Sequence, residues 1–233
     1  MTLPYQKINS TSRIHPTVTI DGEVEIGAHN LIGPYCHLRG PLVIGDRNHI
    51  SGHVMIGMNA EHLTKSSTGK VIIGNRNEIR EHTVIQRGTG EHETEIQNNC
   101  FIMAYSYIAH DCLLESEVIL SARSSLAGHC RILKGASLGL GALLAPFTTI
   151  GSYAFVGMGS IVLKSVQPFS LVVGNPAHFL RFNLQHHEEL SLTEKDLKKK
   201  IGNLTSKNKL VLECIEHFQN NLRDSSKMLL LTK

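Results

Sequence analysis

The fold is decided by the stretch Ile96-Gln-Asn-Asn-Cys-Phe-Ile102-Met-Ala-Tyr-Ser-Tyr-Ile108-Ala-His-Asp-Cys-Leu-Leu114, where an aliphatic residue recurs at every sixth position. The same spacing continues to Val162, and upstream it runs from Ile14 to Ile56 and from Ile73 to Ile85. The repeated positions are Ile14, Ile20, Ile26, Ile32, Leu38, Ile44, Ile50, Ile56, Ile73, Ile79, Ile85, Ile96, Ile102, Ile108, Leu114, Leu120, Leu126, Ile132, Leu138, Leu144, Ile150, Val156 and Val162.

A period of six fits neither an amphipathic helix nor simple strand alternation. It predicts a solenoid whose short flat faces each turn one aliphatic side chain inward. Three faces form a coil of about 18 residues, and successive coils stack as parallel strands about 4.8 Å apart. Gly, Asn and Asp are expected at the corners, because positive φ costs them little.

The repeat slips twice, at Met58–Lys70 and at Gly88–Glu95. Both segments are polar and longer than a corner requires, so we expect two loops that leave the solenoid. Loops on a rigid scaffold often carry binding residues. A tolerated surface insertion remains an equal alternative for either loop taken alone.

Beyond Val172-Val-Gly-Asn-Pro176 the repeat ends and a helical pattern begins. Ser191-Leu-Thr-Glu194 has the form of a capping box. We therefore expect a β-helix domain over residues 1–183 and a helical domain over residues 184–233, with two helices whose apolar stripe covers the last coil or a neighbouring subunit. The stripe comprises Leu197, Ile201, Leu204, Leu210, Val211, Cys214, Ile215, Phe218 and Leu222.

The composition narrows the class of protein. Among the 233 residues, 41% are hydrophobic and the net charge is +3, which indicates a globular chain and is too weak a charge to indicate nucleic-acid binding. No apolar run is long enough for a secretory signal or an integral membrane segment, so a cytoplasmic location is expected. The five cysteines have no zinc-binding spacing and are expected to be reduced core residues.

The register selects two of the 14 histidines. His110 and His129 follow Ile108 and Leu126, which lie eighteen positions apart and so share one face of adjacent coils. We expect the two imidazoles within about one rung of each other. Asp111 is placed to hold the tautomer of an imidazole that acts as a general base. Histidines expected to be solvated surface are His15, His29, His37, His49, His53, His62, His82 and His92.

Four segments together resemble a known family: Ile73–Arg80, Arg87-Gly-Thr89, Ile108-Ala-His-Asp-Cys112 and Leu126-Ala-Gly-His129. They are similar to the acyl-carrier-protein–UDP-N-acetylglucosamine O-acyltransferases, hexapeptide-repeat enzymes that catalyse the first step of lipid A synthesis. The resemblance covers about residues 14–183. It implies a left-handed parallel β-helix, a homotrimer with its site between two subunits, a nucleotide-sugar acceptor and a 3-hydroxyacyl thioester of acyl carrier protein as the donor.

The resemblance also implies roles for individual residues. His110 is the expected general base for the sugar 3-hydroxyl, Asp111 supports it, and the N–H of Gly128 stabilises the oxyanion. His129 is expected to bind the sugar nucleotide. Further expected substrate-binding residues are Tyr107, Gln86, Arg87 and Asn183. No metal or cofactor is expected.

The chain departs from the family pattern at several recognition positions. Tyr107 and Gln86 stand where histidines are usual, Pro146 replaces a glutamine, and Pro176 replaces the histidine of a Gly-Asn-His motif. A phosphate-binding basic pair is missing around Glu188-Glu189. The catalytic set is therefore retained, while the acceptor sugar, the acyl length and O- versus N-acylation stay open.

Other functions remain possible at this point. The segment Val172–Arg181 resembles the end of coenzyme A-dependent sugar acetyltransferases, which favours acetyl-CoA as an alternative donor. A catalytically silent scaffold is disfavoured by the retained histidines, and a zinc enzyme would need a third histidine. Lysines that would attract an acidic carrier protein, or simply form a solvated helix face, are Lys198, Lys199, Lys200, Lys207 and Lys209.

Overall fold

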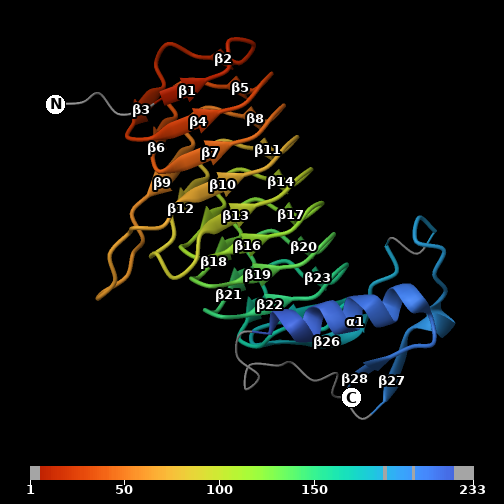
Figure 1. The fold of residues 1–233 in the computed structure, drawn as a ribbon. Coiled ribbons are helices and arrows are strands. Elements are labelled where there is room, and N and C mark those ends of the chain that lie inside the picture. Colours follow the sequence, from red (N-terminus) through yellow and green to blue (C-terminus); the bar gives the residue numbers. More distant parts are fainter. Residues whose placement is uncertain (1–5, 186–187, 201–202, 223–233) are drawn as a thin grey trace.

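A computed structural model describes residues 6–185, 188–200 and 203–222 of the chain. These residues form a three-sided parallel β-helix, and one α-helix lies beside its last coils (Figure 1). The predicted solenoid with a C-terminal helical segment is confirmed. Among the described helices, none is long and apolar enough to cross a membrane.

The three faces are three parallel sheets whose strands follow one another at every third position. The first face contains β1 (Gln6–Ile8), β4 (Val24–Ile26), β7 (Leu42–Ile44), β10 (Val71–Ile73), β13 (Thr94–Ile96), β16 (Leu113–Leu114), β19 (Arg131–Ile132) and β22 (Thr149–Ile150). The second contains β2 (Arg13–Ile14), β5 (Leu31–Ile32), β8 (His49–Ile50), β11 (Glu78–Ile79), β14 (Phe101–Ile102), β17 (Ile119–Leu120), β20 (Ser137–Leu138), β23 (Phe155–Val156), β25 (Ser170–Gly174) and the antiparallel β26 (Ala177–Phe182). The third contains β3 (Thr19–Asp21), β6 (His37–Arg39), β9 (Met55–Met58), β12 (Val84–Gln86), β15 (Tyr107–Ile108), β18 (Ser125–Leu126), β21 (Leu143–Leu144) and β24 (Ile161–Val162).

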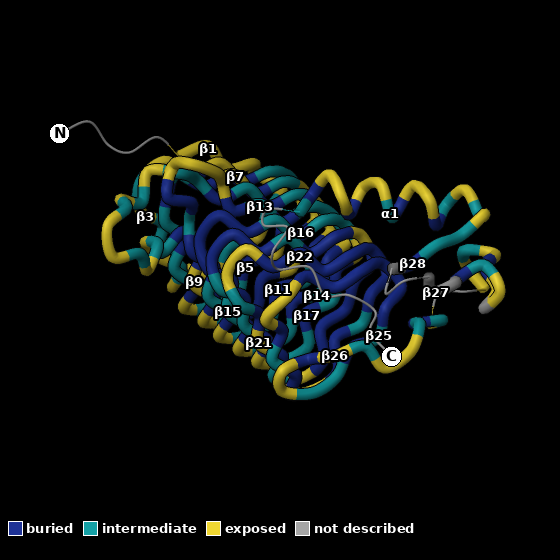
Figure 2. The backbone as a smooth tube through the Cα atoms, turned by 90° about the horizontal axis from the view of Figure 1, so that it is seen from below, coloured by how far each residue is buried: buried dark blue, intermediate teal, exposed yellow. Residues whose placement is uncertain are grey.

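The strand register follows the repeat in the sequence. Ile108 pairs with Leu126, and Leu126 with Leu144, so one coil advances the chain by a constant amount. The residues at these positions are buried along the coil (Figure 2), and their side chains belong to one core cluster. The two predicted loops leave the solenoid between β9 and β10 and between β12 and β13.

A ladder of buried asparagines supplies the hydrogen bonds that the aliphatic core cannot. The Oδ1 of Asn30 accepts from the backbone N–H and the Nδ2 of Asn48, at 2.8 and 3.0 Å. Asn48 in turn accepts from the N–H of Asn77 at 2.9 Å and donates to the carbonyl of Gly74 at 2.9 Å. Each amide thus bonds the coil on either side, which fixes the distance and register between coils.

The corners differ from expectation, because few of their residues at positive φ are asparagine or aspartate. His53 (φ 61°), His82 (φ 60°) and Tyr105 (φ 61°) adopt this conformation although each carries a bulky side chain. Two contacts offset the cost: the His53 N–H donates to the Pro34 carbonyl in the preceding coil at 2.9 Å, and the corner rings stack on one another. The ring centroids of His53 and His82 lie 5.0 Å apart, and those of His82 and Tyr105 4.7 Å apart.

The prediction of two C-terminal helices is wrong. Among the described residues of the tail there is one α-helix, α1 (Lys209–Asn221). It is preceded by a 3-10 turn, η1 (Glu194–Asp196), and by the antiparallel pair β27 (Lys198–Lys200) and β28 (Asn203–Thr205), which lie where the first helix was expected. The proposed capping box fails because Ser191 adopts φ 52°, and Thr193 instead bonds Asp196 through its N–H and its hydroxyl. The lysines at 198–200 are therefore on a strand.

The apolar stripe of the tail nevertheless packs as expected against the end of the β-helix. Leu197, Leu204 and Val211 form one cluster with Tyr153 and Phe169 of the last coils. Positions Ile201 and 223–233 lie outside the described residues, and the division at residue 183 stays a prediction. The tail therefore packs against the last coils in a cluster that is separate from the solenoid core.

We expect the asparagine ladder to contribute to the free energy of unfolding of the β-helix. Replacing Asn48 with Ala leaves the Gly74 carbonyl and the Asn77 N–H buried without these partners, which should lower the free energy of unfolding by about 2–4 kcal/mol. Denaturant unfolding of Asn48→Ala measures this loss. Asn220→Ala, on the exposed face of α1, is the matched control and should change stability by less than about 0.5 kcal/mol. Equal stabilities of the two variants would contradict the role of the ladder.

Candidate active site

Four residues that the sequence singled out meet at one corner of the β-helix. β15 ends at Ile108 and is followed by His110 and Asp111, while β18, in the next coil, ends at Leu126 and is followed by Gly128 and His129. Because β15 and β18 are paired in register, the two corner segments stack directly. The N–H of His129 donates to the carbonyl of His110 at 3.0 Å.

The two imidazoles share one carboxylate. The Nδ1 of His110 lies 2.7 Å from Oδ2 of Asp111, and the Nε2 of His129 lies 3.6 Å from the same oxygen. The rings are nearly perpendicular, with centroids 5.2 Å apart. With Asp111 ionised, His110 donates its Nδ1 proton to the carboxylate, and its Nε2 lone pair is left to accept a proton. The expected adjacency of His110 and His129 is confirmed.

Asp111 is held by bonds that the sequence did not reveal. Thr89 donates to it twice, from its N–H to Oδ1 at 3.0 Å and from its hydroxyl to Oδ2 at 2.9 Å. The N–H of His92 also approaches Oδ1, at 3.3 Å. Burial by itself would raise the pKa of Asp111, but hydrogen bonds from His110 and Thr89 and the positive charge that His129 can carry lower it below its usual value. The carboxylate is therefore ionised and fixed in orientation.

Position 128 requires glycine, because the imidazole of His110 occupies the space that a side chain would need. A Cβ at this position would lie 2.5 Å from Cε1 and 2.8 Å from Nε2 of His110, closer than carbon atoms approach in proteins. The Gly128 N–H has no acceptor within the described part of the chain. A residue with a free backbone N–H thus packs against the His110 ring.

His129 is packed on its other side by an aromatic ring. Its imidazole stacks on Phe147, with centroids 4.5 Å apart and planes 6° from parallel. Burial lowers the pKa of His129, and the negative charge of Asp111 only partly opposes this. Sequence reasoning missed Phe147, although it stands eighteen positions after His129 and so occupies the same corner one coil later.

Two histidines that were expected to be solvated surface belong to this site. His62, from the first loop, meets the His110 ring edge-on at a centroid distance of 5.5 Å. His92, from the second loop, meets the His129 ring at 6.3 Å. Neither loop follows the six-residue repeat, so the repeat carried no signal that placed these rings.

The two loops that carry His62 and His92 are tied to each other by ion pairs. Lys65 and Glu91 form an ion pair at 2.6 Å, and Lys70 and Glu93 another at 3.2 Å. The bond from Lys65 lowers the pKa of Glu91. These contacts hold the loop segments that carry His62 and His92 against the site, and they leave His110 and His129 almost fully buried.

Tyr107 and Gln86 both contact the first loop. The Tyr107 hydroxyl donates to Oε2 of Glu61 at 2.8 Å, and the Glu61 N–H donates to Oε1 of Gln86 at 3.2 Å. Burial, together with the bond to Glu61, raises the pKa of Tyr107, so its hydroxyl stays protonated. Both residues therefore bond to Glu61, the neighbour of His62 in the first loop.

Arg87 and Asn183 are occupied by bonds within the chain. Arg87 donates to the carbonyl of Gly40 at 2.9 Å and to Oδ1 of Asn59 at 2.7 Å. Asn183 donates to the carbonyl of Tyr153 at 2.8 Å, where the tail joins the last coil. The structure does not bring Asn183 into the histidine cluster, and substrate binding by either residue stays a prediction.

The residues at the corner also have the composition of a metal site. His110, Asp111 and His129 present ligand atoms that all lie within 4.8 Å of one another. Hydrogen bonding accounts for the arrangement, because Oδ2 of Asp111 already accepts from His110 at 2.7 Å and from Thr89 at 2.9 Å. The geometry is that of an oriented base with its carboxylate.

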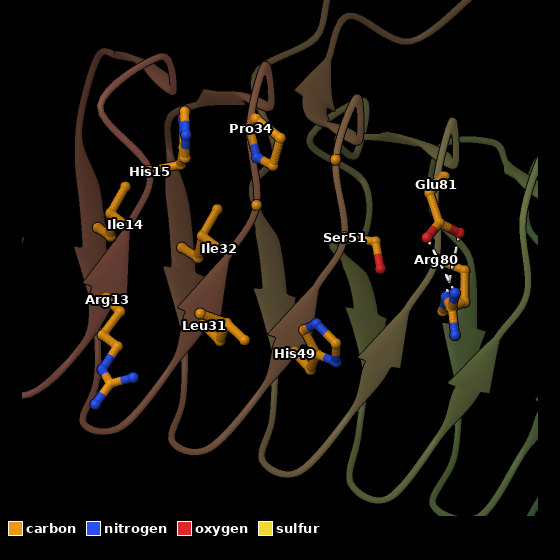
Figure 3. A pocket seen from close by; sticks show the side chains of 12 residues that line it. Arg13, Ile14, His15, Leu31, Ile32, Pro34, His49, Ser51, Arg80 and Glu81 are labelled. Carbon is orange, nitrogen blue, oxygen red and sulfur yellow. Dashed lines mark hydrogen bonds and ion pairs between the residues drawn. The ribbon is translucent and has the colours of Figure 1, made fainter.

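A broad groove of about 540 Å³ lies elsewhere, on the second face between the first coils (Figure 3). Leu31 and His49 project into it, and Arg80, paired with Glu81, closes one end. None of the residues that line this groove belongs to the histidine cluster. The titratable groups, rather than the volume of a groove, mark the corner as the candidate site.

The buried state of His129 predicts a dependence of stability on pH. Because its pKa is lowered in the folded protein, the unfolded chain takes up a proton first as the pH falls below about 6.5. Between pH 7.5 and 5.5 the wild type should lose up to about 1 kcal/mol of unfolding free energy relative to His129→Gln. Denaturant unfolding at both pH values measures this difference. The lowered pKa of His129 would be contradicted if the difference in unfolding free energy between the wild type and His129→Gln were the same at both pH values, or if acid favoured the wild type.

Comparison with known proteins agrees with this geometry. The bacterial transferase hexapeptide family (six repeats) matches residues 23–57. The acyl-(acyl-carrier-protein)–UDP-N-acetylglucosamine O-acyltransferase of Gloeothece citriformis is 34% identical over 79% of this chain and 70% of its own, and that of Stutzerimonas stutzeri is 34% identical over 76% and 75%. The crystal structure of the UDP-N-acetylglucosamine acyltransferase of Francisella novicida superimposes with a TM-score of 0.80 at 25% identity, covering 96% of this chain and 93% of that one.

Both curated relatives are 34% identical to this chain over 76% or more of its length. The chain belongs to the acyl-(acyl-carrier-protein)–UDP-N-acetylglucosamine O-acyltransferase family.

Proposed function

We propose that this protein transfers a 3-hydroxyacyl group from the thioester of acyl carrier protein to the 3-hydroxyl of UDP-N-acetylglucosamine, the first step of lipid A synthesis. The names of the relatives support the donor and the acceptor. One observation in the chain itself carries the chemistry: the Nδ1 of His110 is bound to a fixed carboxylate, and Gly128, whose N–H has no acceptor in the described part of the chain, packs directly against the same ring.

In the proposed reaction His110 acts as the general base. Its Nε2 takes the proton of the sugar hydroxyl while the hydroxyl oxygen attacks the thioester carbon. The ring then carries a positive charge, which the ionised Asp111 stabilises at 2.7 Å without taking the proton itself. The carbon–sulfur bond breaks as the tetrahedral intermediate collapses, and the departing thiolate takes the proton back from His110. No covalent enzyme intermediate is needed.

The N–H of Gly128 is the group assigned to stabilise the negative charge that develops on the carbonyl oxygen of the thioester. A backbone donor in a buried corner needs no reorganisation as the charge develops, so it stabilises the transition state more than the ground state. The almost complete burial of His110 and His129 supports this role, because hydrogen bonds to a developing charge are strong where water is excluded.

His129 and Tyr107 are assigned to the acceptor. His129 has a lowered pKa and so offers a neutral ring beside the base at physiological pH. Tyr107 presents a protonated hydroxyl near the first loop. Gln86 accepts a hydrogen bond from Glu61 of that loop. Arg87 is assigned to holding the same loop in place through its bond to Asn59.

The assembly, the location and the docking of the donor belong to the same proposal. In this proposal the protein is a homotrimer that acts in the cytoplasm, and the acyl chain binds between two subunits. Acyl carrier protein, an acidic partner, would meet the basic tail, where Lys207 and Lys209 are exposed. Lys209 already pairs with Glu213 at 3.6 Å, so the attraction is modest and should weaken in salt.

The first test removes the base and varies the donor. His110→Ala should lower transfer by about 10²- to 10⁴-fold without changing the oligomeric state, because the imidazole is lost and the core is not. Mass spectrometry of UDP-N-acetylglucosamine incubated with 3-hydroxyacyl carrier protein measures the product. His82→Ala, on an exposed corner, is the control. Strong turnover with acetyl-CoA alone, or unchanged transfer by His110→Ala, would overturn the proposal.

A second test probes the corner beside the base. Gly128→Ala places a methyl group where the His110 ring lies, so the ring must move. We expect kcat to fall by about 10- to 100-fold, since an ångström of misplacement has effects of this size. The melting temperature should change little, because the φ of Gly128 is not in the left-handed region. Normal kcat in a folded Gly128→Ala protein would argue against this geometry.

A further inference from the structure

The first loop brings a third imidazole to the base. His62 meets the ring of His110 at a centroid distance of 5.5 Å and an interplanar angle of 71°. The loop is anchored on both sides of it: the N–H of Ala60 donates to the Ser67 hydroxyl at 2.8 Å, and the N–H of Glu61 donates to Gln86 at 3.2 Å. The position of His62 is therefore built into the loop.

The tautomer of His62 follows from its backbone contacts. Its Nδ1 accepts from the N–H of Thr64 at 3.2 Å and from the N–H of Lys65 at 3.1 Å. A ring nitrogen that accepts hydrogen bonds carries no proton, so in the neutral ring the proton is on Nε2. His62 thus points a donor of defined geometry away from its own loop.

This donor has room for a ligand. Within the described part of the chain, Nε2 of His62 has no hydrogen-bond partner. The atom is not buried, so it is exposed to solvent. The ring is half-buried, which limits its motion. A partly buried N–H that is oriented by two backbone amides and open on its outer side is suited to bind an uncharged oxygen acceptor.

We propose that His62 is an acceptor-binding residue whose Nε2–H donates to the acetamido carbonyl oxygen of the sugar. This inference rests on the proposed function, which places the 3-hydroxyl of the sugar at His110. In an N-acetylglucosamine unit the acetamido group is attached to the carbon next to the one that bears that hydroxyl. A donor that adjoins the base is therefore placed to bind this carbonyl, and the bond orients the hydroxyl and discriminates against sugars without the amide.

The test measures the coupling between His62 and the acetamido group. We compare kcat/KM for UDP-N-acetylglucosamine and UDP-glucose in the wild type, His62→Leu and His62→Gln, with 3-hydroxyacyl carrier protein as the donor. The leucine removes the donor, while the Nε2 of glutamine can replace it. His62→Leu should raise the KM for UDP-N-acetylglucosamine about tenfold, with a smaller effect on kcat, and should lose most of the preference over UDP-glucose. His62→Gln should keep both within about threefold.

Each other outcome has a defined meaning. An unchanged sugar preference in His62→Leu would overturn the inference, as would equal impairment of the leucine and glutamine variants, which would indicate ring packing only. His82→Leu, a histidine on an exposed corner, is the matched control and should behave as wild type. If the wild type transfers no acyl group, the proposed function fails. If the wild type transfers it and His62→Leu keeps the sugar preference, only the role of His62 fails.

Discussion

The β-helix depends on hydrogen-bonded stacking of coils that keep one register, even where a loop lengthens a coil. Each coil contributes one inward aliphatic residue per face, and the backbone of the next coil pairs with it in register. The buried ladder of Asn30, Asn48 and Asn77 bonds across the same spacing. Because the register is constant, residues eighteen positions apart become neighbours, and a chemical site is assembled from segments that are distant along the chain.

The active corner is built on this constraint. Asp111, His129 and Phe147 occupy the same corner position in three successive coils, all at positive φ, so each side chain projects against the next. The coil fixes the position of His110, and Asp111 fixes its tautomer, which is the rigidity that its proposed role as a general base requires. Burial lowers the pKa of His129, whereas hydrogen bonds lower that of Asp111, so the corner holds a neutral ring and a charged carboxylate side by side.

The two loops add what the regular coils do not supply. Thr89 orients the Asp111 carboxylate through two bonds, and His62 and His92 face the two corner histidines. The ion pair between Lys65 and Glu91 joins loops from adjacent coils. Tyr107 and Gln86, two positions that depart from the family pattern, both bond to Glu61 of the first loop. These departures therefore surround one loop, while His110 and Asp111 keep their geometry.

The sequence by itself determined the three faces, the two loops and the meeting of His110 with His129, because a constant period converts directly into position in space. It misjudged the tail, where Ser191 at φ 52° and the pairing of β27 with β28 replace the expected helix. Only the tertiary structure decided that His62, His92 and Thr89 join the site. Their placement depends on contacts between aperiodic loops, and such contacts have no signature in the order of residues.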